Sequence, residues 1–469
     1  MSVQTTSESK THAPQAETFR RQHPAPLKSR ALKIPAPVET KLANGLRIAI
    51  VRDERLPMVS FRLAFRGGDS NDPAEMPGLS DMMAHLLTEG TANRTSLQIA
   101  EEVERLGATL SVSSASDFAT IGASSLAVYA DEILDLIADV TLQPSFPQNE
   151  IDLARDNTKQ MLIQQRAQPN FLASERVAKV MFGQHPYARI SPTGESLDAM
   201  TRDTFTAFHR KSFAPDRAVL VVVGDVDPDE TAARLAELFG DWTSDPHPEP
   251  TFLAPPERNA RVLYVIDRSG SAQSNIVIAN AGITRTSSDY FPMLLMHTIL
   301  GANASSRLFM NLREEKGYTY GAYSSLDARR LAGTFRATAE VRTPVTGASL
   351  HEFLFELNRI RDERVPDEEL RNAKSYLTGV FPIRIETQDG LIDQLTSVKM
   401  FDLPQDYLQT YRDRVNEVTA ADVQRVAELY VTPDRAAIVI VGDATEIENQ
   451  IKDYAETIER YDTEGNKKQ

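Results

Sequence analysis

An internal repeat constrains this chain more than any other feature of its sequence. Residues 215–225 read Pro-Asp-Arg-Ala-Val-Leu-Val-Val-Val-Gly-Asp, and residues 433–443 read Pro-Asp-Arg-Ala-Ala-Ile-Val-Ile-Val-Gly-Asp, an offset of 433 − 215 = 218. A second pair, Pro-Gln-Asn-Glu at 147–150 and Pro-Asp-Glu-Glu at 366–369, has an offset of 366 − 147 = 219. Two matches at nearly the same spacing predict two duplicated halves with related folds.

The length of 469 residues also argues for several domains rather than one core. A stretch with five prolines in thirteen residues, 244–256, can continue neither a helix nor a central strand and is expected to link the halves. The sequence therefore predicts a disordered polar tail, a first half, a linker, a second half and a short polar tail, at residues 1–37, 38–243, 244–258, 259–462 and 463–469.

Each half shows the same order of patterns. Extended apolar segments come first, then helical spacings, and each half closes with a fully apolar run that is typical of a buried strand. The expected strands include 47–51, 59–65, 262–266 and 275–279, and the expected helices include 99–106 and 130–142. We expect an α+β protein of two homologous halves, with helices packed on one face of mainly antiparallel sheets.

Composition excludes several classes of function. With 51 basic and 66 acidic side chains the net charge is −15, which disfavours binding to a phosphate backbone, so nucleic acid is not an expected partner. The longest apolar runs, 218–223 and 436–441, are far too short to cross a membrane. The absence of cysteine removes disulfides and thiolate ligands. No signal peptide is seen at the start, so a cytoplasmic location is expected, with the periplasm left open.

The segment from Gly78 to Thr91 holds the residues that bear on a metal. Asp81 and His85 stand one helical turn apart and could both face a cation. A catalytic zinc needs three protein ligands and a general base, which these two residues do not supply. The plainer interpretation is an acidic residue near the start of a helix and a packed histidine.

The frame Gly-Leu-x₅-His-x₄-Gly-Thr in this segment resembles the zinc helix of the M16 peptidases, the pitrilysin and insulinase family that includes mitochondrial processing peptidase. That family carries H-x-x-E-H, two histidine ligands with a glutamate base. On this frame the chain has Asp81, Ala84 and His85, and the family's distal glutamate ligand falls on Met161. The resemblance thus implies the M16 (LuxS-like metallohydrolase) fold, in a clamshell, with base and two ligands lost and no metal site in this chain.

The second half carries the other matching motif, Leu-Arg-Glu-Glu-Lys-Gly-Tyr-Thr-Tyr-Gly at 312–321. Its Arg313 and Tyr320 match the family's arginine and tyrosine pair, in which the phenol donates a hydrogen bond to the oxyanion and the guanidinium holds a substrate carbonyl or carboxylate. The alternative is that Arg313 pairs with a neighbouring glutamate, Glu314 or Glu315, while the tyrosines of this segment simply pack.

The resemblance implies a non-zinc subunit of a two-chain M16B-type metallopeptidase. A paralogous partner with an intact motif would bring the zinc, and this chain, inactive alone and without a cofactor of its own, would contribute Arg313 and Tyr320 to a heterodimer that cleaves peptides. The alternative, from another class, is a catalytically inert M16-like scaffold or assembly protein. Of the remaining candidates, His209 and Trp242 are expected to be packing residues, and His247 falls in the linker.

Overall fold

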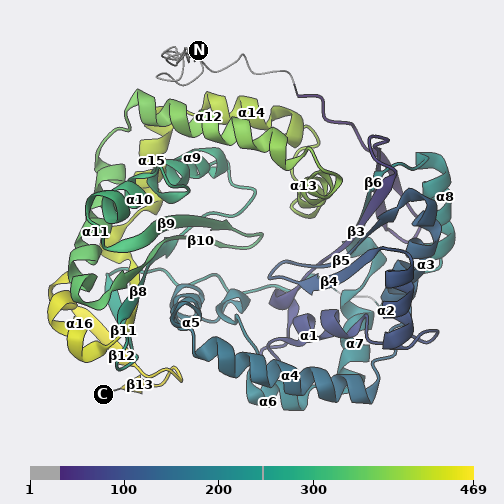
Figure 1. The fold of residues 1–469 in the computed structure, drawn as a ribbon, viewed down its shortest axis with the longest axis horizontal. Coiled ribbons are helices and arrows are strands. Elements are labelled where there is room, and N and C mark those ends of the chain that lie inside the picture. Colours follow the sequence, from purple (N-terminus) through teal and green to yellow (C-terminus); the bar gives the residue numbers. More distant parts are fainter. Residues whose placement is uncertain (1–31, 246–247, 469) are drawn as a thin grey trace, which may run out of the picture. The chain divides into compact units, whose positions relative to one another are not determined.

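Two β-sheets organise the chain in this computed structural model, which describes residues 32–245 and 248–468. Figure 1 shows both sheets with their helices. The first sheet is six-stranded, in the order β1-β2-β6-β3-β5-β4. Strands β2 and β6 pair in parallel, and the other neighbours are antiparallel. Its strands are β1 (Val38–Lys41), β2 (Arg47–Arg52), β3 (Met58–Arg66), β4 (Thr109–Ser114), β5 (Phe118–Leu126) and β6 (Ala218–Gly224).

The second sheet has seven strands, in the order β13-β12-β7-β11-β8-β10-β9. Here β7 runs parallel to both β11 and β12, and the other pairs are antiparallel. Its strands are β7 (Val262–Asp267), β8 (Gln273–Ala281), β9 (Thr319–Ala328), β10 (Gly333–Arg342), β11 (Ala437–Gly442), β12 (Thr457–Tyr461) and β13 (Lys467–Lys468).

The repeated sequence forms equivalent strands of the two sheets. Strand β6 lies between β2 and β3, and β11 lies between β7 and β8, so each copy occupies the centre of its sheet. Every residue of both strands is buried, which explains why both copies are apolar without alternation. Each strand follows a short 3₁₀ turn made by the Pro-Asp-Arg of the repeat, η5 (Pro215–Arg217) and η8 (Pro433–Arg435). The duplication predicted from the sequence is therefore confirmed in the fold.

Helices pack on these sheets, which confirms the α+β class. Those between β3 and the linker are α1 (Leu79–Leu86), α2 (Ser96–Arg105), α3 (Ala130–Leu142), α4 (Gln148–Arg166), α5 (Pro169–Phe182), α6 (Gly194–Ala199), α7 (Arg202–Ser212) and α8 (Pro228–Phe239). Those beyond the linker are α9 (Tyr290–Gly301), α10 (Arg307–Phe309), α11 (Thr346–Asp362), α12 (Asp367–Arg384), α13 (Gln388–Met400), α14 (Tyr407–Glu417), α15 (Ala420–Tyr430) and α16 (Ala444–Ile451).

One face of the first sheet packs against helices of the same half. Ala218, Leu220 and Val222 of β6 belong to a large apolar cluster that also holds buried residues of α1, α3, α4 and α8. Trp242 lies in this cluster at 8% exposure, in edge-to-face contact with Phe65, so its expected packing role is confirmed. These helices form the predicted layer on one face of the sheet.

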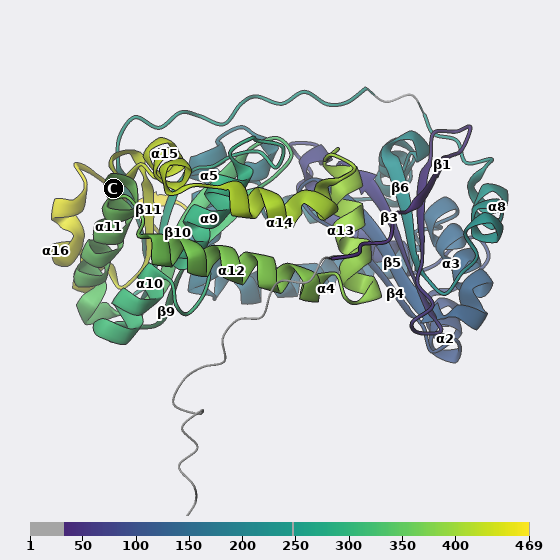
Figure 2. The same cartoon turned by 90° about the horizontal axis from the view of Figure 1, so that it is seen from above.

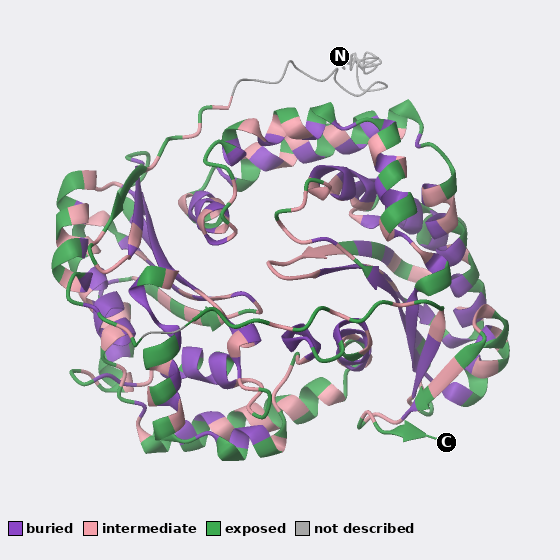
Figure 3. Ribbon diagram, turned by 180° about the vertical axis from the view of Figure 1, so that it is seen from behind, coloured by how far each residue is buried: buried purple, intermediate pink, exposed green. Residues whose placement is uncertain are grey.

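The opposite face of each sheet receives a helix from the other half. Helix α13 packs on β3 and β6 of the first sheet, and α5 packs on β8 and β11 of the second. The helix α5 covers Ala437, Val439 and Val441 of β11. Because both faces of β6 and β11 are covered, both strands are buried throughout, as the buried central strands in Figure 3 show. The described residues from Pro35 onward accordingly form one compact unit.

The connection between the halves is extended. Residues 248–260 contain no helix or strand, and Figure 2 shows this stretch as a long trace along the top of the view. His247 lies outside the described residues, as does the part of the predicted tail before residue 32. At the other end, β12 and β13 pair as an antiparallel hairpin, so the second sheet extends to Lys468. Among the described residues no helix has the length and apolar character needed to cross a bilayer.

Candidate functional site

Helix α1 carries the Gly-Leu-x₅-His part of the motif, and the residues around its first turn hold it firmly in place. Gly78, with φ of 88°, precedes the helix in a left-handed conformation, and a β-carbon there would lie 2.7 Å from the Pro192 ring. The buried carboxylate of Asp72 accepts hydrogen bonds from the N–H groups of Gly78 (2.8 Å) and Ser80 (2.9 Å) and from the Ser80 hydroxyl (2.6 Å). Burial raises the pKa of Asp72 to about 7, against the effect of these donors.

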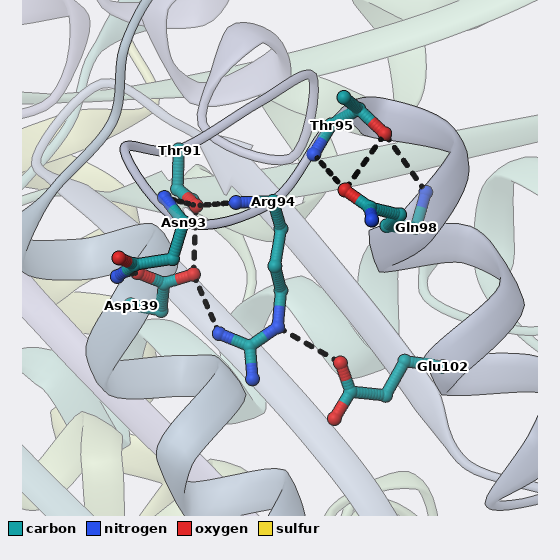
Figure 4. A network of polar contacts seen from close by, with 7 residues as sticks. All are labelled: Thr91, Asn93, Arg94, Thr95, Gln98, Glu102 and Asp139. Atoms are coloured by element: carbon teal, nitrogen blue, oxygen red, sulfur yellow. Dashed lines mark hydrogen bonds and ion pairs between the residues drawn. The ribbon is translucent and has the colours of Figure 1, made fainter.

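The Gly-Thr end of the motif is also held by a polar network, shown in Figure 4. Thr91 and Asn93 each donate a 2.7 Å hydrogen bond to the carboxylate of Asp139 in α3. Arg94 joins this carboxylate (2.7 Å) to Glu102 in α2 (2.8 Å). Asp139 is 7% exposed, and three side chains donate to its carboxylate. Because these charge-assisted bonds are strong, the loop after α1 is fixed to two neighbouring helices.

The positions that would carry the zinc chemistry lack suitable groups. Asp81 and His85 are exposed on α1, whereas Ala84 is 1% exposed and offers only a methyl group. Met161, on α4, is 53% exposed and offers a thioether, a soft donor that suits zinc poorly beside imidazole or carboxylate. No cluster of three His, Cys, Asp or Glu side chains that could hold a metal occurs among the described residues. The donor set at this site therefore does not fit a catalytic zinc.

Arg313 lies on the π-helical turn η6 (Met310–Glu315), between α10 and β9. Its side chain is 45% exposed, with Nε 3.5 Å from Glu314 Oε1, and its guanidinium stacks 4.8 Å from the centre of the Phe309 ring. An exposed ion pair of this kind contributes little stability, so the guanidinium remains available to a ligand. The expected pairing with a neighbouring glutamate is thus present with Glu314, in a weak form.

Tyr320 stands near the start of β9, the edge strand of the second sheet. The pairing with β10 shifts here: Tyr320 and Gly321 together lie opposite Glu340, which is a β-bulge. The hydroxyl of Thr319 donates to the Glu340 carbonyl (2.6 Å) and accepts from the Gly321 N–H (3.1 Å), which fixes the bulge. The Tyr320 side chain is 90% exposed, so the alternative in which it packs in an aromatic strand is wrong for this residue.

A tight turn connects the two candidate residues. The Gly317 N–H donates to the Arg313 carbonyl (3.1 Å), and the Tyr318 N–H donates to the Leu312 carbonyl (2.9 Å). Gly317 has φ of 64°, which glycine adopts without strain. The structure therefore places Arg313 and Tyr320 on adjoining segments, both open to solvent, as a guanidinium and a phenol that can donate hydrogen bonds to an oxygen-rich ligand.

A buried polar contact joins the halves and has no local signal in the sequence. Asp117, after β4, is 5% exposed and accepts a hydrogen bond from the hydroxyl of Tyr187 and another from the Arg330 N–H (2.8 Å). The Leu331 N–H donates to the Tyr187 hydroxyl (3.2 Å). Burial is the largest cause that raises the pKa of Tyr187. This network docks the β9–β10 turn on the first half, and only the tertiary fold brings its members together.

Two family profiles match the chain in sequence order. The profile described as insulinase (peptidase family M16) matches residues 47–192, and the profile described as peptidase M16 inactive domain matches residues 199–377. Together they cover more than half of the chain. The boundary between them falls before α7, so the two profiles do not coincide with the two sheets.

Relatives and solved structures give the same assignment. The chain is 26% identical over 411 residues to an uncharacterised zinc protease of Mycobacterium leprae, covering 86% of this chain and 91% of that protein. It is 22% identical over 405 residues to the non-peptidase homolog YmxG of Helicobacter pylori, covering 85% and 93%. The crystal structure of a peptidase M16 inactive domain from Pseudomonas fluorescens matches with a TM-score of 0.82 at 27% identity, covering 87% and 98%. The chain belongs to the M16 peptidase family, as a member with a degenerate zinc motif.

Proposed function

We propose that this chain is the non-zinc subunit of a two-chain M16B-type metallopeptidase. In this proposal a paralogous partner with an intact H-x-x-E-H helix binds the zinc. The present chain binds the peptide and stabilises the oxyanion at that metal through Arg313 and Tyr320. The observation that carries the proposal is the contrast between the described parts of the two halves. The first half lacks the motif's general base and two of its three ligands, while the second has an exposed hydrogen-bond donor at Tyr320 on a backbone fixed by the bulge.

The conformation around Tyr320 suits a hydrogen-bond donor to a transition state. Its phenol is solvent-exposed while its backbone is held by the bulge, so the donor can meet a partner subunit without reorganising its strand. A phenol that reaches the oxygen on which negative charge develops lowers the barrier more than it strengthens substrate binding. Arg313, with its planar set of donors, supplies the complementary hold on a carbonyl or carboxylate of the same peptide.

Peptide substrates are supported by the open edges of the sheets. Strand β4 ends the first sheet and β9 ends the second, and both have alternating, half-exposed residues. An extended peptide can add to such an edge through main-chain hydrogen bonds. Recognition of this kind depends on an unfolded segment more than on particular side chains.

The second candidate function is an inert scaffold or assembly protein. The Helicobacter relative, named a non-peptidase homolog, favours it, because that protein is similar to this chain over most of both lengths. Under this alternative Arg313 keeps only its contacts with Glu314 and Phe309.

Reconstitution tests the proposal. The purified chain should hold no stoichiometric zinc and should not cleave unstructured peptides, because Ala84 and Met161 offer neither base nor ligand. An M16 paralogue with an intact motif, encoded by the same genome, should form a stable complex with it. That complex should contain one zinc per pair and cleave peptides in a chelator-sensitive manner.

Size-exclusion chromatography, metal analysis and a peptide assay on the same fractions measure all three properties. Stoichiometric zinc and peptidase activity in the isolated chain would contradict the division of labour. A paralogue that is equally active with and without this chain would support the scaffold instead.

A further inference from the structure

Arg336, in β10, is a cation without an ion pair in the described part of the chain. Its Nε donates a 3.2 Å hydrogen bond to the Thr334 hydroxyl. None of the described carboxylates lies within ion-pair distance of its guanidinium. Burial lowers the pKa of Arg336, as expected for a charge that is drawn partly away from water. Because an unpaired, half-buried charge is costly, this position favours an anionic ligand.

The two terminal nitrogens of Arg336 are open to solvent. Neither Nη1 nor Nη2 has a hydrogen-bond partner among the residues that the structure describes, and neither belongs to the side-chain atoms that are sealed from water without a partner. A guanidinium presents these two nitrogens side by side, in the geometry that matches the two oxygens of a carboxylate. A ligand can therefore reach this side of the group without breaking a contact within the chain.

The acidic group that acts on Arg336 is already paired with another arginine. Asp327, on β9, contacts Arg329 through Nε (2.8 Å) and Nη2 (2.6 Å). The effect of Asp327 on Arg336 is a longer-range attraction, and the positive charge of Arg329 opposes it. Within the described residues one carboxylate thus serves two guanidinium groups, which leaves one positive charge uncompensated.

The corresponding face of the first sheet shows the opposite arrangement. There Arg62 of β3 lies under α13, and Asp393 of that helix contacts its guanidinium at 3.1 Å. Arg336 lies on the equivalent face of the second sheet, opposite Ala279 of β8, which α5 covers. Helix α5, all of which is described, places no carboxylate within ion-pair distance of Arg336. The free charge is therefore a particular feature of the second sheet.

The place of Arg336 in the sheet puts it within reach of a peptide at the β9 edge. It pairs across the sheet with Ser325 of β9, and β9 is the last strand on that side. Neighbouring strands lie about 4.8 Å apart, so a peptide strand added to β9 would run roughly 10 Å from β10. Ser325 stands between them, and its short, exposed side chain leaves room for an arginine and a longer side chain to meet above it.

We propose that Arg336 binds a carboxylate of an extended peptide that lies along β9, carried either by an acidic side chain or by the C-terminus of the peptide. This inference rests on the peptide-binding part of the proposed function and adds a substrate class to it. Ser325 follows Tyr320 by 325 − 320 = 5 residues, about 17 Å along a strand, so the contact is remote from the bond to be cleaved. A remote contact of this kind strengthens binding and holds the peptide in register for the reaction.

Binding of short peptides to the isolated full chain tests the proposal. The probes are fluorescently labelled Gly/Ser/Thr peptides of about ten residues, the length of β9, with blocked ends. One carries a central glutamate, the second carries glutamine in its place, and the third is the glutamine peptide with a free C-terminal carboxylate. At least one carboxylate peptide should bind about tenfold more tightly than the blocked glutamine peptide, measured by fluorescence anisotropy. The peptide that does so identifies the source of the carboxylate.

Matched variants locate the contact. Arg336→Gln should abolish the difference between the peptides, whereas Arg336→Lys, which keeps the charge, should retain part of it. Arg342→Gln, at the exposed end of the same strand, is the control and should keep the wild-type difference. Equal affinity of all three peptides for the wild type, or an undiminished difference in Arg336→Gln, overturns this inference alone. Absence of binding by every peptide overturns it together with the peptide-binding role of the chain.

Discussion

At residue 84 a buried methyl group stands where an M16 peptidase needs a general base, and the surroundings of α1 are nonetheless preserved. Asp72 still caps the helix and Asp139 still holds the loop that follows it. These contacts hold α1 in place although the residues at two ligand positions and at the base position of the motif differ. The packing of α1 in this structure therefore does not depend on a metal. The fold around α1 is thus retained although residues of the zinc motif are replaced by other side chains.

Introducing the ligands and the general base of the M16 motif should restore zinc binding more readily than peptidase activity. In the variant Asp81→His, Ala84→Glu, Met161→Glu, the carboxylate introduced at position 84 would enter a buried site, so the metal-free variant should melt below the wild type. Added zinc binds the folded state and should raise its melting temperature, while the wild type should not respond. Peptidase activity should stay low, since the residues that orient the ligands are not restored. Melting curves with zinc and with chelator, together with metal analysis, check this, and a variant that takes up no zinc would show that the three positions are misaligned.

His209 provides a pH-dependent test at the same scale. Burial lowers its pKa to about 4, although its Nε2 lies 2.8 Å from the Thr141 carbonyl. The pKa of His209 in the folded state is below its value of about 6.5 in the unfolded chain. Neutral His209 therefore contributes fully to the free energy of unfolding above about pH 6.5, and this contribution is lost as the pH falls towards about 4. Relative to His209→Gln, which keeps a donor for Thr141, the wild type should lose unfolding free energy across this window. Denaturant titrations at several pH values check this; parallel curves for the two proteins would mean that His209 is not buried neutral.

The sequence identifies candidate site residues by their spacing within motifs, but it does not predict how exposed their side chains are. Arg313, Tyr320 and Met161 are located by their places in motifs. The 90% exposure of Tyr320 is not predictable in this way, because it depends on a bulge in β9 that appears only where β9 pairs with β10. Likewise, the free terminal nitrogens of Arg336 depend on which acidic side chains the fold brings near them.

Among the elements, α5 and α13 carry the coupling between the halves. Strands β6 and β11 are recognisable from the repeat, with β6 at Ala218–Gly224 and β11 at Ala437–Gly442. Their second covering layer is not predictable, because a strand that is apolar on both faces does not reveal which helix covers each face. Helix α13 of the second half covers one face of the first sheet, and helix α5 of the first half covers one face of the second sheet. Each half therefore depends on the other to bury one face of its sheet.

A substitution in α13 should therefore weaken the first half. Leu395 is 4% exposed on this helix. Leu395→Ala should cost about 2–5 kcal/mol of unfolding free energy. The chain has a single tryptophan, Trp242, whose fluorescence reports on the first half, so its unfolding midpoint should fall although the substitution is in the second. Ile383→Ala, at a 66% exposed position of α12, is the matched control and should change little. An unchanged tryptophan midpoint in Leu395→Ala would mean that the halves unfold independently.

At the scale of the whole molecule, two halves have diverged in chemistry while keeping one architecture. Within the described residues the first half keeps only His85 of the motif's ligands and base, and the second presents Tyr320 on the edge strand β9 with Arg313 on the adjoining turn η6. The polar contact of Asp117 and Tyr187 with the β9–β10 turn joins the two within one compact unit. The chain belongs to the M16 family and has a degenerate zinc motif, which is why a partner subunit is central to the proposed function.

Turnover by the Tyr320→Phe variant in the assembled two-chain complex tests the proposed shared active site most directly. Loss of one donor to the oxyanion should lower the turnover number about 10²- to 10³-fold, with the Michaelis constant, zinc content and assembly nearly unchanged. Tyr323→Phe is the matched control, because Tyr323 lies on the same strand but is less exposed, at 44%, and its ring centre lies 5.7 Å from that of Phe309. We predict a large loss of turnover for Tyr320→Phe and little for Tyr323→Phe, and an unaltered rate in an intact Tyr320→Phe complex would contradict the shared site.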